Sequence, residues 1–330
     1  MLQLSVNAPP IQWYPGHIAK AEKALNGNLA KVDLVIEVRD ARIPLATGHP
    51  RLQRWISGKQ HLLVLNRVDM VSRSAREAWS DWFRQRGETV WWCDAKAGTG
   101  VKQLQQAAIR AGAALNARRS GRGMKPRPVR ALMLGFPNVG KSALINRLVR
   151  QKVVDSARRA GVTRSLRWVR LGQDLDLLDA PGVLPPRLDD QQAALRLALC
   201  DDIGQAAYDN EAAALAFVEL LGLLEQVPAA GVPAGLLQQR YGLALGVLPG
   251  GTPDRESWLL AAAERHTSGD TTRMATKLLD DFRCSRLGAI ALELPSHGQV
   301  SGETQLPAEA QLPADSSVPL ETTLLAAERP

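Results

Sequence analysis

A phosphate-binding pattern occupies residues 135–142, which read GFPNVGKS. It fits the G-x-x-x-x-G-K-[ST] motif and lies between an apolar run and a helical run, which is the context that the motif requires. Its glycines permit a tight turn that points backbone N–H groups at phosphate oxygens. Lys141 is expected to contact the β- and γ-phosphates, and Ser142 to ligate Mg²⁺. We predict nucleotide contacts from Gly135, Asn138, Val139, Gly140, Lys141 and Ser142.

A second pattern, LDLLDAPG at residues 175–182, ends an apolar run in a carboxylate and a glycine. Asp179 is expected to hold the magnesium shell, directly or through water, and the Gly182 N–H to sense the γ-phosphate. D-x-x-G alone is a common turn, but its position some forty residues after the first motif supports this assignment. Between the two motifs lies Thr163, where a switch threonine would ligate Mg²⁺. We predict catalytic roles for Thr163 and Lys141.

A third pattern predicts recognition of a guanine base. HLLVLNRVD at residues 61–69 is similar to the N-K-x-D signature of GTPases. Asp69 would accept hydrogen bonds from the N1–H and the exocyclic amine of guanine, a pair of donors that adenine lacks. Asn66 would tie this loop to the phosphate loop, and the stem of Arg67 would lie along the base. Lysine is usual at the position of Arg67, but a guanidinium also stacks well.

A fourth pattern, TVWWCDAK at residues 89–96, ends a strand-like run in Asp94, Ala95 and Lys96. It resembles the S-A-K motif, whose alanine N–H contacts guanine O6, although aspartate replaces serine. Both base motifs precede the phosphate motifs, which is the order of a circularly permuted GTPase. Permutation is physically tolerable because the termini of α/β domains lie at the surface, often close together.

Short apolar runs that alternate with helical segments are expected to position these motifs. Strand-like runs that are apolar almost throughout are typical of a parallel sheet buried on both faces. We therefore predict an α/β fold: a doubly wound, mostly parallel sheet, whose ligands bind at the carboxyl ends of the strands, followed by a small, mainly helical domain. The expected strands are 32–38, 61–66, 89–93, 130–135, 166–171 and 175–179, and the expected helices include 74–87 and 101–117.

The distribution of charge predicts the domain organisation. The 330 residues carry 41 Lys and Arg against 33 Asp and Glu, a net charge of +8. Residues 296–330 carry five acidic and one basic residue, or −4, and have a disordered-tail composition, so residues 1–295 carry +12. We predict a GTPase domain at 1–186 with a mobile basic linker at 117–130, a helical domain at 187–295 and a disordered tail.

Composition also excludes several protein classes. Hydrophobic residues make up 45% of the chain and charged residues 22%, which excludes fibrous and wholly disordered proteins. Three cysteines fit neither a disulfide framework nor a zinc cluster. No apolar run is long enough to span a membrane, and the N-terminus has no signal-peptide pattern. We expect a cytoplasmic monomer.

Taken together, these motifs resemble the RbgA/YlqF-type branch of circularly permuted ribosome-assembly GTPases. The resemblance extends over residues 12–294 and includes WYPGHIAKA at 13–21, VIEVRDARIP at 35–44 and DDFRCSRLGAIALE at 280–293. It implies GTP hydrolysis coupled to maturation of the large ribosomal subunit, contacts with rRNA, slow intrinsic turnover and stimulation by the ribosome. Asn138 matches an asparagine of potassium-stimulated GTPases, so K⁺ is a second expected cofactor beside Mg²⁺.

The sequence lacks the residue that usually orients the attacking water during GTP hydrolysis. Val183 follows the D-x-P-G pattern, where Ras-type GTPases have a glutamine, and an apolar side chain cannot hydrogen-bond to water. The resemblance implies His17 as the substitute, and a near-neutral pKa suits this role. The alternative is that His17 only caps or anchors the first helix after Pro15 and Gly16.

Basic clusters near the phosphate motifs and on the expected C-terminal helices leave several functions open. A cluster of cations is usually a solvated face, but clusters flanking a nucleotide switch favour contact with RNA phosphates. The alternatives are a constitutive RNA-binding scaffold with a structural nucleotide and an assembly GTPase for the small subunit or another RNA. The cations are Arg118, Arg119, Arg122, Lys125, Arg127 and Arg130, a switch group from Lys152 to Arg170, and Arg273, Lys277, Arg283 and Arg286.

Overall fold

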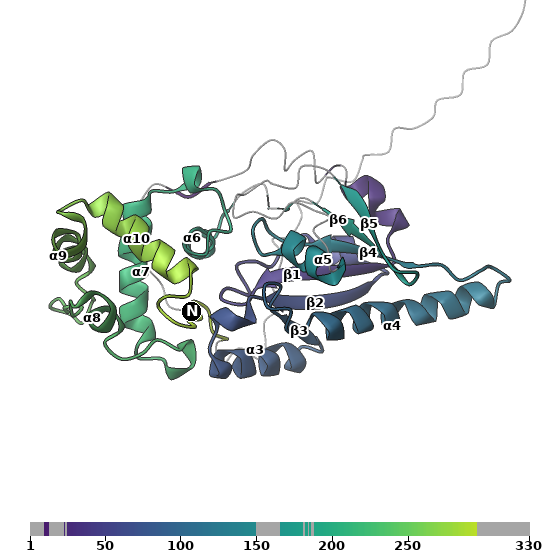
Figure 1. Cartoon of the computed structure of the whole chain (residues 1–330), viewed down its shortest axis with the longest axis horizontal. Helices are drawn as coiled ribbons and strands as arrows, with labels where there is room; N and C mark the ends of the chain where they lie inside the picture. The colour runs from purple at the N-terminus through teal and green to yellow at the C-terminus, as the bar shows by residue number, and fades with distance from the viewer. Residues whose placement is uncertain are drawn as a thin grey trace, which may run out of the picture. The chain divides into compact units, whose positions relative to one another are not determined.

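A six-stranded sheet forms the first part of the molecule (Figure 1). The computed structural model describes residues 10–12, 23, 25–149, 166–180, 182–183, 185 and 188–295. The strand order is β3-β2-β1-β4-β6-β5, in which β5 alone runs antiparallel to its neighbour. The strands are β1 (Leu34–Asp40), β2 (Gln60–Asn66), β3 (Val90–Cys93), β4 (Val129–Leu134), β5 (Arg167–Leu171) and β6 (Leu175–Asp179). The predicted mostly parallel sheet is confirmed.

Alternate residues of the strands face opposite layers of helices. In β1, Leu34 and Ile36 pack in the hydrophobic cluster that includes residues of α4 and α5, whereas Val35 packs with Trp55 of α2. The next strand, β2, sends Leu63 toward Trp79 of α3. The sheet is thus covered on both faces, as a doubly wound fold requires. These helices are α2 (Leu52–Ile56), α3 (Arg73–Gln85), α4 (Val101–Ser120) and α5 (Lys141–Val149).

Helices dominate the described chain after β6. Aspartate side chains accept hydrogen bonds from free backbone N–H groups at the starts of four of them, through Asp190, Asp209, Asp254 and Asp270. Met274, Leu278 and Phe282 of the last helix are buried, as their four-residue spacing predicts. The helices are α6 (Gln191–Leu199), α7 (Asn210–Leu224), α8 (Leu236–Tyr241), α9 (Arg255–Thr267) and α10 (Thr271–Arg283), with short 3-10 turns η1 (Leu29–Lys31), η2 (Val68–Met70), η3 (Gln205–Ala207) and η4 (Pro228–Ala230).

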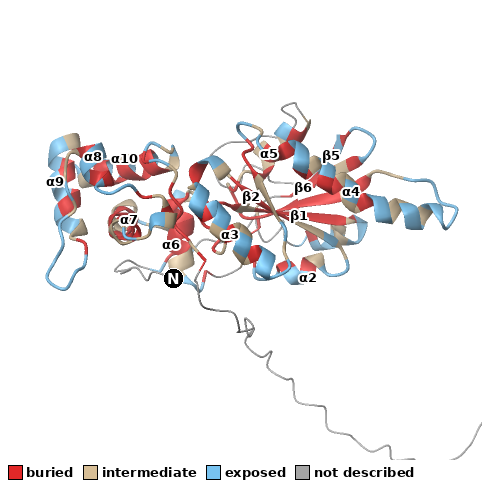
Figure 2. Ribbon diagram, turned by 90° about the horizontal axis from the view of Figure 1, so that it is seen from below, coloured by how far each residue is buried: buried red, intermediate tan, exposed pale blue. Residues whose placement is uncertain are grey.

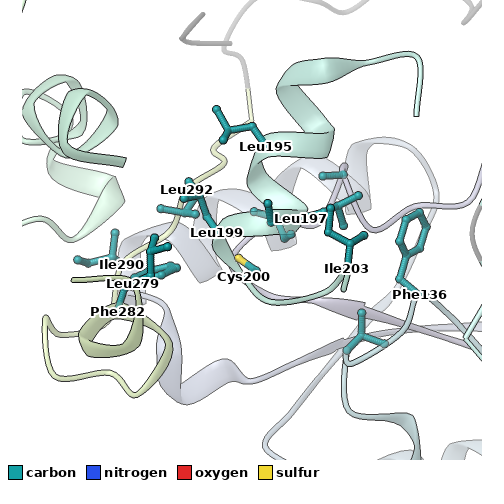
Figure 3. Packing of buried hydrophobic residues seen from close by; sticks show 14 of the residues in the cluster. Phe136, Leu195, Leu197, Leu199, Cys200, Ile203, Leu279, Phe282, Ile290 and Leu292 are labelled. Atoms are coloured by element: carbon teal, nitrogen blue, oxygen red, sulfur yellow. The ribbon is translucent and has the colours of Figure 1, made fainter. Parts of the chain in front are cut away.

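One hydrophobic cluster includes both the helices and a residue of the phosphate loop. Figure 3 shows Phe282 of α10, Leu197 and Leu199 of α6, Ile203 and Phe136 among its members. Figure 2 shows the corresponding buried stripes on α6, α7 and α10. The described residues up to Pro295 belong to one compact unit. The division at residue 186 stays a prediction.

The segment predicted as a basic linker is shorter than expected. Helix α4 continues to Ser120 and β4 begins at Val129, so only residues 121–128 connect them, and the predicted linker at 117–130 was too long at both ends. Alanine and arginine are good helix formers, which extends α4 until Gly121 and Gly123 interrupt the run. Arg127 is also fixed in place, since its guanidinium forms two hydrogen bonds with Asp33, at 2.7 and 2.9 Å.

Candidate nucleotide-binding site

The predicted nucleotide motifs gather at one edge of the sheet. Strands β3, β2, β1, β4 and β6 are parallel, so their carboxyl ends meet at the same edge. Asn66 ends β2, Asp94 follows β3, Gly135 follows β4 and Asp179 ends β6. The fold therefore brings together base and phosphate motifs that lie up to 113 residues apart in the chain, from Asn66 to Asp179.

Asn66 joins three of the predicted loops. Its Nδ2 donates to the carbonyl oxygen of Val139 in the phosphate loop at 2.9 Å, and its Oδ1 accepts from the Ala95 N–H at 3.1 Å. The residue is 2% exposed, so water competes little for these bonds. The contact with the phosphate loop is the one predicted for Asn66.

Gly140 makes this arrangement possible. Its φ of 98° lies in the region that favours glycine, and a Cβ there would lie 2.2 Å from Asn66 Nδ2. Gly135 allows an equally close approach, because a Cβ would lie 2.2 Å from the carbonyl oxygen of Val38 in β1. Both motif glycines thus serve the packing of the phosphate loop onto the neighbouring strands, in addition to its own turn.

The Ala95 loop is held inward by side chains. Asp94 Oδ1 accepts from the Lys96 N–H at 2.7 Å and from the Ala97 N–H at 3.0 Å, so aspartate here shapes a turn as a serine hydroxyl does elsewhere. The Ala95 N–H, which was predicted to contact guanine O6, instead donates to Asn66. That role stays a prediction, and it requires this bond to be shared or exchanged when a base binds.

Asp69 lies in the short turn η2, directly after the loop that Asn66 and Arg67 form. Partial burial and the Asp94 carboxylate raise the pKa of Asp69. A base that donates two hydrogen bonds to this carboxylate favours its ionised form and opposes that shift. The predicted contact with guanine would therefore offset the electrostatic cost that burial and Asp94 impose on the ionised Asp69 carboxylate.

Arg67 makes contacts that its motif does not predict. The residue has a left-handed φ of 66°, and its Nη1 donates to Asp40 Oδ2 at 2.7 Å. Its Nη2 donates to the carbonyl oxygen of Asn138 in the phosphate loop. A guanidinium can make both contacts because its N–H donors point in different directions within one plane. A lysine ammonium is a compact point charge and cannot span both acceptors in this way. This explains why arginine suits the position, while its packing along a base stays a prediction.

Asp40 and Arg42 form a buried pair behind Arg67. Asp40 Oδ1 accepts from Arg42 Nε at 3.0 Å and Oδ2 accepts from Arg42 Nη2 at 2.8 Å, with both side chains fully buried. Burial raises the pKa of Asp40, but the Arg42 and Arg67 guanidiniums outweigh it and the pKa is lowered. Arg42 Nη2 also donates to the carbonyl oxygen of Cys200, at the end of α6. The pair thus connects β1, the base loop and the helical part.

Lys141 and Asp179 lie at the phosphate end of the site. Lys141 begins α5, is 6% exposed, and donates from Nζ to the carbonyl oxygens of Gly135 and Phe136 at 3.0 and 2.7 Å. Burial lowers its pKa to about 8, although Asp179 and Asp202 oppose this shift. A bound phosphate would offer the ammonium stronger, charged acceptors than these carbonyls.

The residues present fit a magnesium ion. Ser142 is in the first turn of α5, and the fully buried Asp179 ends β6, so a hydroxyl and a carboxylate lie at the phosphate end of the site. Among the described residues, no group of three or more His, Cys, Asp or Glu side chains could by itself hold a metal ion. Mg²⁺ in a phosphate-loop site needs none, because it takes most of its ligands from nucleotide phosphates and water.

The loop after β6 packs directly on the phosphate loop. The Val183 N–H donates to the carbonyl oxygen of Gly135 at 3.1 Å, and a Cβ at Gly182 would lie 2.5 Å from the backbone nitrogen of Pro137. The Val183 side chain is buried in an apolar cluster with Leu178 and Ala180. Val183 therefore has no means to orient a water molecule. His17 and Thr163, predicted as catalytic, lie outside the described residues.

Asp202, which lies behind the phosphate loop, has no signal in the sequence. Asn138 Nδ2 donates to the carbonyl oxygen of the neighbouring Asp201 at 2.7 Å. Asp202 is fully buried, its oxygens have no hydrogen-bond partner in the described structure, and its Oδ1 lies 3.8 Å from Arg67 Nη1. Asp40 and Arg42 lie within the quoted VIEVRDARIP segment, but no spacing signals Asp202, because its neighbours are distant in the chain.

The pH dependence of stability should change when Asp202 is replaced. Burial and the Asp40 carboxylate raise the pKa of Asp202 well above its ordinary value. The folded state favours the neutral Asp202 carboxyl, whereas the unfolded state ionises it near the ordinary aspartate pKa. Asp202 therefore lowers the free energy of unfolding increasingly as pH rises above that value. We expect Asp202→Asn, which stays neutral, to match wild type in urea unfolding at about pH 4 and to be the more stable at about pH 8. Equal pH profiles for both proteins would contradict this.

Comparisons with known proteins agree with the motifs and the fold. A model described as "50S ribosome-binding GTPase" matches residues 130–219, which begin at the strand before the phosphate loop. The "Ribosome biogenesis GTPase A" of Bacillus cereus is 39% identical over 188 residues, covering 57% of this chain and 64% of that protein. The same-named protein of Bacillus pumilus is 36% identical, over 57% of this chain and 67% of that protein. The chain belongs to the RbgA/YlqF family.

More distant relatives extend the match. "Mitochondrial GTPase 1" of Aedes aegypti is 32% identical over 247 residues, covering 67% of this chain and 77% of that protein. The GNP-bound YlqF of Thermotoga maritima has the same fold, with a TM-score of 0.54 and 21% identity over 83% of this chain and 98% of that one. The part of this chain that aligns with the Bacillus cereus protein spans just under two thirds of that protein's own length. No helix of the described residues has both the length and the apolarity that crossing a bilayer requires.

Proposed function

We propose that this chain is a GTP-hydrolysing switch that binds the maturing large ribosomal subunit, contacts its rRNA and assists late assembly. The observation that carries the proposal is the position of Asn66, which hydrogen-bonds to the phosphate loop and to the Ala95 loop. This arrangement supports one ligand site shared by the predicted base and phosphate contacts, although the base motifs come first in the chain. The names of the family's relatives support ribosome assembly as the setting.

In this proposal the chain's own residues bind and orient the nucleotide. Asp69 selects guanine, Lys141 neutralises the β- and γ-phosphates, and the N–H of Gly182 reads the γ-phosphate. Ser142, Thr163 and Asp179 would hold magnesium, which would supply charge neutralisation at the phosphates. Because Val183 cannot orient water, another group completes the site, and we propose His17 for it. Potassium at Asn138 is a further proposed activator.

Contacts of the phosphate loop with the loop after β6 and with the helical part support a route for signalling. Val183 bonds to the phosphate loop, and Asn138 of that loop bonds to Asp201 after α6. A change at the γ-phosphate would therefore act on the start of the proposed helical domain, residues 187–295. Of its predicted rRNA contacts, Arg273 is exposed and Lys277 is half-buried. Arg283 instead donates to the carbonyl oxygens of Ala198 and Leu199, so it stabilises α6.

The test is GTP turnover by the full chain with purified ribosomal subunits. We expect slow turnover alone, at least about tenfold stimulation by the large subunit, as partner completion of such sites allows, and none by the small subunit. Binding to the large subunit should be tighter with a non-hydrolysable GTP analogue than with GDP. Equal binding in both nucleotide states would favour a constitutive RNA-binding scaffold, and stimulation by the small subunit alone would reassign the partner.

A further inference from the structure

The end of α4 and the loop that follows it form a basic arm, which we define as residues 113–128. Both views show this segment extending beyond the sheet (Figures 1 and 2). Gly112 is where α4 crosses the start of β4, since a Cβ there would lie 1.7 Å from Val129 Cγ2. The eight helical residues beyond it add about 12 Å of helix at 1.5 Å per residue. The arm therefore presents its tip away from the nucleotide site.

The arm has an unusually one-sided charge. From residue 95 to residue 154 the chain carries thirteen lysines and arginines and no aspartate or glutamate. Within the arm, Arg118, Arg122 and Lys125 are exposed, and none of them forms an ion pair in the described part of the chain. Such a concentration of uncompensated cations creates a strong local positive potential. The surface is suited to a polyanion.

Several contacts fix the shape of the arm. The side chain of Asn116 exchanges two hydrogen bonds with the backbone of Arg127, at 3.0 and 3.1 Å, and Arg127 is held in turn by Asp33. Arg119 donates from Nε and Nη2 to the carbonyl oxygen of Lys125, which closes the tip. The outgoing helix and the returning chain are thus bonded to each other. The cations at the tip are presented on an ordered support, which reduces the entropy lost on binding.

The composition of the arm favours one form of RNA. Residues 94–135 contain no phenylalanine, tyrosine or tryptophan. Single-stranded RNA is usually bound by aromatic side chains on which bases stack, whereas duplex RNA is recognised by its shape and its phosphates. Arginine forks and a lysine on a rigid support match phosphates along a duplex backbone.

We propose that the basic arm is a docking element for duplex RNA, which contacts backbone phosphates through Arg118, Arg122 and Lys125 without reading the sequence. The inference rests on the proposed function, because it names the part of the rRNA contact that this arm makes. It predicts binding that depends on the double-stranded form and steeply on salt. It also predicts that the arm acts independently of the nucleotide, since none of these three residues contacts the site.

The test compares the full chain with a triple variant, Arg118→Ala, Arg122→Ala and Lys125→Ala. Affinity for a short, protein-free RNA duplex and for one of its separated strands is measured over a range of salt concentrations. We expect the slope of log affinity against log salt to become shallower by about 3, and duplex affinity to fall about 100-fold near 0.1 M salt, as loss of three phosphate contacts implies. Affinity for the single strand should change much less.

A matched variant controls for net charge. Arg54→Ala, Arg76→Ala and Lys102→Ala also removes three exposed cations, and they lie outside the arm. It should keep wild-type affinity for the duplex, and both variants should keep wild-type GDP affinity and helical content. Equal losses in the two variants, or equal losses for single strand and duplex, would overturn the proposal. So would weaker large-subunit binding with unchanged duplex binding, since the arm would then contact ribosomal protein.

Failure of the proposed function looks different. If wild-type protein neither hydrolyses GTP faster with subunits nor prefers the large subunit, the ribosomal switch is wrong, whatever the arm variant does. If those properties hold and the arm variant binds the duplex as wild type does, only the inference about the arm is wrong.

Discussion

Replacing Asp69 with asparagine is expected to weaken GDP and GTP binding by at least about 100-fold, because two hydrogen bonds to a charged acceptor are lost. The asparagine amide presents an acceptor and a donor where the carboxylate presents two acceptors. It cannot pair with both the N1–H and the amine of guanine, but it matches xanthine, which has a carbonyl at the position of the amine. We therefore expect Asp69→Asn to bind xanthine nucleotides more tightly than guanine nucleotides. Displacement of a fluorescent nucleotide by GDP, XDP and ADP measures all three affinities.

A control separates the base contact from general effects of the substitution. Asp81→Asn changes an exposed carboxylate of α3 and should leave all three affinities unchanged. Without nucleotide, Asp81→Asn should unfold at the wild-type temperature. Asp69→Asn should unfold at the same or a higher temperature, because it removes a carboxylate whose pKa burial and Asp94 raise. If Asp69→Asn binds GDP within about tenfold of wild type, its assignment as the guanine acceptor is wrong.

Replacing Asp40 with asparagine is expected to lower the free energy of unfolding by about 3 kcal/mol or more, because two guanidiniums lose the carboxylate that neutralises them. Arg42 is fully buried, and water cannot replace the lost partner. Asp202 lies close enough to compensate in part: once Asp40 is neutral, Arg67 and Arg42 should lower the pKa of Asp202 and favour its ionised form. Urea unfolding near pH 7 measures the loss.

The double variant tests this compensation. Asp40→Asn with Asp202→Asn leaves no carboxylate beside the two guanidiniums, so the loss should exceed the sum of the single effects. Glu77→Gln, which removes the exposed partner of Arg73, should have no measurable effect on unfolding, because water replaces that contact. Additive effects in the double variant would show that Asp202 does not respond to Asp40.

Much of the fold was predictable because its signals are local. The strands β2 and β6 were predicted within one residue, since each is a short apolar run that ends at a motif. Helix α4 was predicted with its start correct and its end three residues short, because helix ends depend on the context of Gly121 and Arg127 as well as on propensity. Basic residues were harder to interpret. Arg127 and Arg283 belonged to predicted RNA-binding clusters, but both stabilise the fold.

The sequence alone determined the phosphate loop, the two base motifs, their permuted order and the alternation of strands and helices. Each of these is encoded by residues within one turn or one strand, so spacing is sufficient to find them. The tertiary structure decided the buried group of Asp40, Arg42, Arg67 and Asp202, and the fixed shape of the basic arm. Their contacts join segments up to 162 residues apart, from Asp40 to Asp202, and a buried charge acquires its meaning only from the partner that folding places beside it.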